Sequence, residues 1–297
     1  IFSTKTQEPS QIPDVKINSD LPKTFYAHKL STQARFLIPV FAGTNCEYET
    51  AKAIHKAGGK PEIFVVRTLT PELMRQSAEE FSRKLKDSQA LVLPGGFSNG
   101  DEPDGSGKFI AIFLRSPEVS ESVADLLDKQ GGLVCGICNG FQALVKTGLL
   151  LFGKICSPEE LPSTLTFNSI GRHQSKIIRS KVISNSSAWL KKTKVGEIYS
   201  IPISHGEGKF ICDEKIFASL MNNGQIAGQY VDIEGNPSMK TQYNPSGSFY
   251  AVECLTSPDG RILGRMGHVE RVGNDLYRNV SGNYDMKFFE SACEYFN

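Results

Sequence analysis

The sequence predicts an α/β protein with a doubly wound, mostly parallel sheet, helices on both faces and an antiparallel β extension. Between residues 35 and 148, short apolar runs of strand length alternate with longer runs of helical periodicity. Buried strands separated by helices are typical of parallel sheets. Between about 163 and 270, polar and apolar residues alternate singly, which favours antiparallel strands with one exposed face.

The first half is expected to contain strands and helices in strict alternation. The strands are expected at 34–43, 60–67, 89–96 and 131–137, and the helices at 46–58, 71–86 and 139–148. Pro71 favours a helix start at that position. In parallel sheets the ligand lies beyond the carboxyl ends of the strands. The loops PGGFSNGD and ICNG both follow strands and are therefore expected at that edge.

The second half is expected to form antiparallel strands and to end in a helix. The strands are expected at 175–184 and 196–204, a last strand and loop at 261–272, and an amphipathic helix at 284–296. Residues 1–34 are polar, contain three prolines and show no sustained period. We interpret 1–34 as a linker or strap from a preceding domain, and 35–297 as one domain.

Charge and composition exclude several classes of partner. The 33 basic and 32 acidic residues give a net charge of +1, whereas nucleic-acid binders carry clustered basic excess. No apolar run approaches the ~20 residues that span a bilayer. The 7 cysteines are odd in number and widely spread, which favours a reducing, cytoplasmic setting over a disulfide framework.

The stretch LVCGICNGFQ at 133–142 poses the main chemical question. Cys135 and Cys138 are spaced as C-x-x-C, which is compatible with a redox pair, half of a metal site or a turn that presents one nucleophile. No second C-x-x-C and no paired histidines accompany them, so no metal is expected. Small residues flank Cys138 at a strand-to-helix turn, where the helix N-terminus favours a thiolate. We favour Cys138 as nucleophile, with an inert buried cysteine as the alternative.

Two backbone N–H groups are candidates for an oxyanion hole. Gly96 follows a predicted strand at the same sheet edge, and Asn139 comes directly after Cys138. A thiolate that attacks an acyl group needs donors of this kind to stabilise the developing negative charge.

Two histidines compete for the role of general base. His268 follows the last predicted strand, and Glu270 two residues later could orient its ring. His205 has Glu207 at the same spacing. The residue pattern alone does not choose between them.

Taken together, LPGGFSNGDEPDGSGKF, GICNGFQALVKTGLL, SHGEGKF, NPSGS and GRMGHVER resemble the class I (triad) glutamine amidotransferases. More narrowly, they resemble the glutaminase domain of phosphoribosylformylglycinamidine synthase, a ligase of purine biosynthesis, from about residue 35 to the end. The resemblance implies a flavodoxin-like sheet. It also implies a catalytic triad of Cys138, His268 and Glu270, oxyanion-hole donors at Gly96 and Asn139, and a substrate contact at Gln142.

The resemblance further implies that the chain hydrolyses glutamine to glutamate and ammonia through a cysteinyl thioester. The ammonia would pass to a synthetase domain or subunit, in which ATP and Mg²⁺ convert formylglycinamide ribonucleotide to the amidine. The chain itself lacks a G-x-x-x-x-G-K-[ST] loop, so no cofactor is expected in it. Because it begins at Ile1 with a polar lead-in, we expect the C-terminal glutaminase domain of the long single-chain form.

Two departures from the family pattern stand out. The region 102–122 differs from the usual sequence, and Val269 replaces a common proline between His268 and Glu270. A competing hypothesis is a cysteine peptidase or deglycase-like hydrolase on a similar sheet. Its nucleophile turn usually lacks a glutamine at the position of Gln142.

Overall fold

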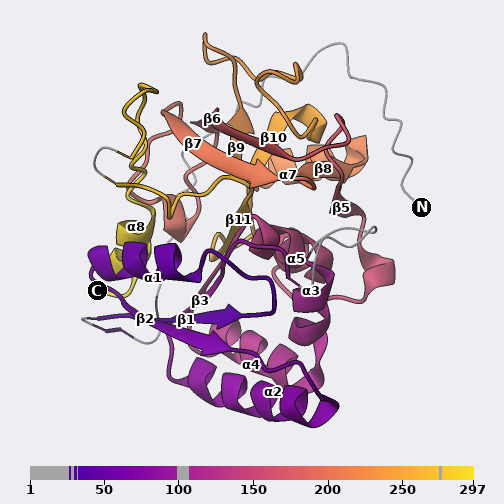
Figure 1. Cartoon of the computed structure of the whole chain (residues 1–297), viewed down its shortest axis with the longest axis vertical. Coiled ribbons are helices and arrows are strands. Elements are labelled where there is room, and N and C mark those ends of the chain that lie inside the picture. The colour runs from indigo at the N-terminus through magenta and orange to yellow at the C-terminus, as the bar shows by residue number, and fades with distance from the viewer. Residues whose placement is uncertain (1–26, 28–29, 32, 99–106, 274–275) are drawn as a thin grey trace.

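The computed structural model describes residues 27, 30–31, 33–98, 107–273 and 276–297. Its centre is a 9-stranded sheet of order β2-β1-β3-β4-β11-β10-β9-β6-β7, beside a 2-stranded sheet of β5 and β8 (Figure 1). The proposed linker at 1–34 lies mostly outside the described residues. Where it is described, the Ser31 N–H donates to the Phe296 carbonyl at 2.9 Å, which joins it to the C-terminal end.

The strands that precede the candidate site pair in parallel, as predicted. They are β1 (Arg35–Val40), β2 (Lys60–Val65), β3 (Ala90–Leu93), β4 (Leu133–Ile137) and β11 (Ile262–Arg265). β3, β4 and β11 are buried along their whole length. Burial on both faces explains why these strands read as continuous apolar runs.

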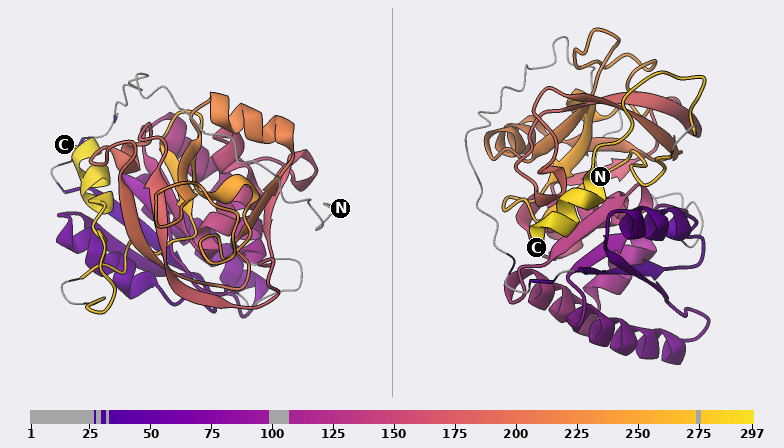
Figure 2. Two further views of the ribbon diagram at one scale, coloured as in Figure 1. Left: turned by 90° about the horizontal axis from the view of Figure 1, so that it is seen from above. Right: turned by 90° about the vertical axis from the view of Figure 1, so that its left-hand side faces the viewer.

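Helices cover the parallel strands from both sides. On one side α1 contacts α8, and on the other α2, α4, α3, α5 and α6 form a continuous layer. Figure 2 shows α8, in yellow, and α2, in purple, on opposite sides of these strands. Their bounds are α1 (Glu47–Lys56), α2 (Pro71–Lys86), α3 (Lys108–Arg115), α4 (Pro117–Asp128), α5 (Asn139–Thr147), α6 (Leu149–Phe152) and α8 (Phe288–Tyr295). In the described part of the chain, no helix is both long and apolar enough to cross a membrane.

The antiparallel extension continues the same sheet. β11 pairs in parallel with β4 on one edge and antiparallel with β10 on the other, so it forms the border between the two halves. The remaining elements are β5 (Ser163–Thr166), β6 (Gln174–Val182), β7 (Ile198–His205), β8 (Lys209–Cys212), α7 (Glu214–Asn222), β9 (Ile226–Tyr230) and β10 (Val252–Thr256), with 3-10 helices at Pro158–Glu160, Ala188–Leu190 and Phe249–Ala251. The predicted fold class is confirmed.

Four helices, α3, α4, α6 and α7, lie where the sequence pattern predicts none. α3 has the sequence KFIAIFLR, an apolar run of strand length, and its residues Ile110, Phe113 and Leu114 are buried. A short helix that is buried on most of its surface cannot be told from a strand by periodicity. α2, by contrast, begins where predicted, because Thr70 accepts a hydrogen bond from the Leu73 N–H at 3.2 Å and Pro71 follows it.

Glycines allow α5 to lie directly against the sheet. A Cβ atom at Gly140 would lie 2.1 Å from the Leu93 carbonyl oxygen of β3, and one at Gly136 would lie 2.5 Å from the Gly140 oxygen. Both contacts are with backbone, which cannot rotate away. The height of α5 above β3 and β4 therefore depends on these two residues.

Gly140→Ala is expected to destabilise the protein by at least about 2 kcal/mol, because the new methyl group must push α5 off the sheet. Urea unfolding followed by circular dichroism measures this change. Gly273→Ala, where a Cβ meets nothing within 4 Å, is the matched control and should change the free energy of unfolding by less than about 0.5 kcal/mol. Equal effects of the two variants would contradict the packing argument.

Candidate active site

Cys138 lies at a strained turn between β4 and α5. Its backbone has φ 53° and ψ −104°, a region that non-glycine residues adopt only when the surrounding structure imposes it. Two hydrogen bonds hold the turn: the Cys138 N–H donates to the Arg265 carbonyl at 2.8 Å, and the Gln142 N–H donates to the Cys138 carbonyl at 3.1 Å. This is the geometry of a nucleophile elbow, in which a strand turns sharply into a helix.

His268 and Glu270 lie beside this turn because β11 runs parallel to β4 and ends at the same edge. His268 Nδ1 is 2.6 Å from Glu270 Oε1, and both side chains are buried. A Cβ atom placed on Gly95 would lie 2.8 Å from His268 Cε1 and 3.4 Å from Cys138 Cβ. The absence of a side chain at Gly95 is thus what allows the ring and the cysteine to approach each other.

The protonated form of His268 is stabilised by its neighbours. Burial is the largest single influence and lowers its pKa, but its neighbours, the Glu270 carboxylate first among them, together raise the pKa of His268 well above the ordinary value. The nearby thiols of Cys138 and Cys46 act in the same direction. The ring is therefore able to hold a proton while Glu270 keeps it oriented through Nδ1.

Cys46 is a member of this cluster that the sequence reasoning missed. Its buried Sγ lies 3.8 Å from His268 Nδ1 and accepts a hydrogen bond from Arg271 Nη2 at 3.1 Å. Sulfur, nitrogen and oxygen atoms of Cys46, His268 and Glu270 lie within 4.8 Å of one another, a donor set that suits a soft divalent cation. The Arg271 guanidinium already supplies a positive charge at that sulfur. The expectation that the chain binds no metal stays a prediction.

The two expected oxyanion donors lie on either side of the turn. Gly96, with φ +145°, forms an isolated antiparallel bridge with Thr44. The two hydrogen bonds of this bridge are made by the residues flanking Gly96, so neither uses its own N–H. Asn139 is the first residue of α5, where N–H groups have no acceptor within the helix.

Gln142 joins α5 to the loop after β7. Its Oε1 accepts a hydrogen bond from Asn139 Nδ2 at 2.9 Å, and its Nε2 donates to the Glu207 carbonyl. The side chain is buried. Gln142 therefore holds the helix and the loop together, and its expected contact with a substrate stays a prediction.

His205 lies at the end of β7, next to Ser204, whose carbonyl is 3.8 Å from Cys138 Sγ. Its Nδ1 lies 3.0 Å from Asn168 Oδ1. Burial, reinforced by the nearby His268 and His173, lowers the pKa of His205 to about 3. The ring is therefore neutral near neutral pH. The carboxylate-paired ring in the site is that of His268.

Cys135 and Cys138 are both free thiols in the structure. Cys135 is completely buried within β4. Burial raises the pKa of its thiol well above the ordinary value, which disfavours the thiolate that redox exchange requires. This environment supports the interpretation of Cys135 as a small core residue.

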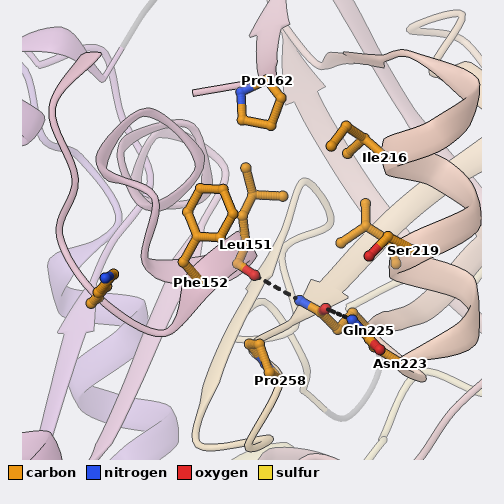
Figure 3. Close-up of a pocket in the computed structure, with 10 residues that line it drawn as sticks. Leu151, Phe152, Pro162, Ile216, Ser219, Asn223, Gln225 and Pro258 are labelled. Atoms are coloured by element: carbon orange, nitrogen blue, oxygen red, sulfur yellow. Dashed lines mark hydrogen bonds between the residues drawn. The ribbon is translucent and has the colours of Figure 1, made fainter. Parts of the chain in front are cut away.

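A cavity of about 380 Å³ lies away from these residues (Figure 3). It is bordered by Leu151 and Phe152 of α6, by Ile216 of α7 and by Pro258. Pro258 precedes β11, whereas His268 follows it, so the cavity is at the opposite end of this strand from the cysteine and histidine. We assign it no part in the chemistry.

A family model described as a CobB/CobQ-like glutamine amidotransferase domain matches residues 33–296. Phosphoribosylformylglycinamidine synthase subunit PurQ of Methanococcus maripaludis (strain C7) is 33% identical over 276 residues, covering 86% of this chain and 94% of that protein. The protein of the same name from Treponema denticola is 35% identical over 252 residues, covering 80% and 87%.

A solved structure of PurLQS from Thermotoga maritima is similar in fold, with a TM-score of 0.63 at 24% identity. The match covers 89% of this chain and 100% of that chain. The prediction that the present chain derives from a long single-chain form stays a prediction.

The buried neutral His205 is expected to make stability fall with pH below the ordinary histidine pKa. With a folded-state pKa of about 3 and an ordinary value of 6.5, the unfolded chain binds more protons between these values, so stability is lost as pH falls. Between pH 7.5 and 5.5 the free energy of unfolding of His205→Gln should therefore fall by about 1 kcal/mol less than that of the wild type. Urea unfolding at both pH values measures this difference.

His55→Gln, at an exposed position of α1, is the matched control for the chemical change. Each variant is compared with itself at two pH values, so pH-independent losses cancel. Full wild-type acid sensitivity in His205→Gln would contradict this role of the buried ring.

Proposed function

This chain belongs to the CobB/CobQ-like glutamine amidotransferase family, and we propose that Cys138, His268 and Glu270 form its catalytic triad. The chain is the glutaminase part of phosphoribosylformylglycinamidine synthase, an amidotransferase of purine biosynthesis. The observation that supports the triad is the approach of His268 and Cys138 around Gly95, with Glu270 held at 2.6 Å from the ring.

In the first step the Cys138 thiolate attacks the side-chain amide carbon of glutamine. A carbon–sulfur bond forms, and the carbonyl oxygen becomes an oxyanion that the N–H groups of Gly96 and Asn139 stabilise. Each such donor contributes about 3 kcal/mol to transition-state stability. The position of Asn139 at the start of α5 adds the favourable field of a helix N-terminus.

In the second step His268 transfers its proton to the amide nitrogen, and the carbon–nitrogen bond breaks to release ammonia. A glutamyl thioester on Cys138 remains. His268, now neutral, removes a proton from water, which attacks the thioester and releases glutamate and the thiolate. Glu270 stabilises the imidazolium whenever the ring is charged, in agreement with the raised pKa of His268.

The partner of this chain is a synthetase component, as the naming of its relatives as a synthase subunit indicates. We propose that the released ammonia reaches that component, in which ATP and Mg²⁺ activate the amide of formylglycinamide ribonucleotide. We also propose a cytoplasmic location, since 7 cysteines without a disulfide pattern suit a reducing compartment. Residues 1–34 would connect the glutaminase domain to a preceding one.

A glutamine-mimicking electrophile should label Cys138 and no other cysteine when the chain is incubated with it, with or without its synthetase partner. Peptide mass mapping identifies the labelled residue, and release of ammonia from glutamine gives the matching activity. Cys138→Ser should abolish both signals, whereas Cys135→Ser should retain them, because only Cys138 lies on the turn. Labelling of another cysteine, or new amino termini from a peptide library in place of ammonia, would contradict the proposal.

Gly95→Ala is expected to lower the rate of ammonia release at least about tenfold while leaving the fold intact. Its Cβ would lie 2.8 Å from His268 Cε1 and 3.1 Å from Cys46 Sγ, so the ring must move away from the thiol, and a small misplacement of a catalytic group has a large effect on rate. Steady-state kinetics measure the rate of ammonia release, and thermal unfolding shows whether the fold is intact. The matched variant Gly206→Ala meets nothing within 4 Å and should keep nearly full activity.

A further inference from the structure

A buried ion pair lies next to the proposed triad. Arg265 Nη2 is 2.6 Å from Glu253 Oε2, with the two side chains only 1% and 0% exposed. Glu253 Oε2 also accepts a hydrogen bond from Ser180 Oγ at 2.7 Å. Burial is the largest single influence and disfavours the charged guanidinium, but the groups that face it, the Glu253 carboxylate first among them, together raise the pKa of Arg265.

The other oxygen of Glu253 holds the turn that carries His268. Glu253 Oε1 accepts the Gly267 N–H at 3.0 Å, and Gly267 immediately precedes His268. The His268 N–H itself donates to the Pro202 carbonyl of β7 at 2.9 Å. The short turn is thus held from two directions.

Arg265 connects the same network to the nucleophile. It is the last residue of β11, and its carbonyl accepts the Cys138 N–H at 2.8 Å. The side chain of Arg265 therefore fixes Glu253, which holds the His268 turn, while its backbone holds the Cys138 turn. The two residues of one ion pair are thus hydrogen-bonded to both turns.

Stability alone does not account for a pair in this position. Removing two charges from water offsets most of their attraction, and well-packed apolar residues of similar size often stabilise a core as well or better. Buried ion pairs are better explained where they specify one arrangement among several. The arrangement specified here is the relative placement of the His268 and Cys138 turns.

We propose that Glu253 and Arg265 are positioning residues that hold His268 beside Cys138, through acceptance of the Gly267 N–H by Glu253. The proposal rests on the proposed triad. The space at the turn supports it: a Cβ atom on Gly267 would lie 3.0 Å from Glu253 Oε1 and 2.5 Å from Ile201 Cγ2. The carboxylate therefore fits against a residue that has no side chain.

Two paired substitutions separate positioning from stability in the full chain. Glu253→Leu with Arg265→Met removes both charges together and leaves the Gly267 N–H without its acceptor. Glu253→Gln with Arg265→Met also removes the ion pair but keeps an amide oxygen for Gly267, while Ser180 accepts from the amide nitrogen. The readout is the pH dependence of Cys138 alkylation by iodoacetamide, followed by peptide mass.

The Leu/Met variant should react about tenfold more slowly at pH 7, because a displaced His268 no longer assists loss of the thiol proton, and its alkylation rate should rise only at higher pH than in the wild type. The Cys138 alkylation rate of the Gln/Met variant should stay within about twofold of the wild-type rate. The proposal is overturned if the Leu/Met variant keeps the wild-type profile, or if the Gln/Met variant loses as much as the Leu/Met variant. Should the Leu/Met variant not fold, Gly267→Ala separates the turn from Glu253 and must give the same shift.

Controls distinguish this inference from the proposed function. Ser180→Ala removes the hydrogen bond to Glu253 Oε2 and the one that Ser180 Oγ accepts from Arg265 Nη2 at 3.5 Å. It leaves the bond between Glu253 Oε1 and the Gly267 N–H in place, so it should lower the melting temperature without moving the alkylation profile. His268→Ala must shift the profile in the wild-type background. If it does not, the triad assignment itself fails; if it does and the Glu253 variants behave as wild type, only the positioning role fails.

Discussion

The parallel pairing of β4 with β11 is the contact on which the rest of the site depends. It places Ile137 opposite Arg265, and the Cys138 N–H donates to the Arg265 carbonyl just beyond the last paired residues. Two segments far apart in the chain thereby end at the same edge, one with a thiol and the other with an imidazole. Further side chains of the site adjoin these two ends: Glu270 and Cys46 contact the ring, and Asn139 and Gln142 belong to the helix that follows the thiol.

Local chemistry made much of this arrangement predictable. The parallel strands were recognisable because both of their faces are buried, and the turn at Cys138 because small residues flank it where a strand gives way to a helix. The preference for His268 over His205 came from the family resemblance, since the residue spacing is the same for both. The structure adds a physical difference: His268 faces a carboxylate, whereas His205 faces the amide of Asn168.

The features that could not be predicted depend on contacts between distant segments. Cys46 begins a helix that carries no chemical motif, and only the packing of its loop against Gly95 brings it to His268. Glu253 lies inside an ordinary antiparallel strand, where a carboxylate usually faces water. α3 was missed because it is short and apolar. In each case the deciding neighbour is a residue of another element, which no local pattern contains.

The border position of β11 also bears on how the protein assembles during synthesis. Leu263 pairs with Cys135 and Gly264 with Gly136. This edge of β4 therefore stays unpaired until β11, more than a hundred residues later in the sequence, has been synthesised. Contacts of such high sequence separation form slowly, because a long loop has to close first. A ribosome-bound chain that stops before β11 would expose an unpaired apolar edge on β4, a surface that invites aggregation. The pairing of β11 with β4 therefore both completes the candidate active site and covers the edge that would otherwise aggregate.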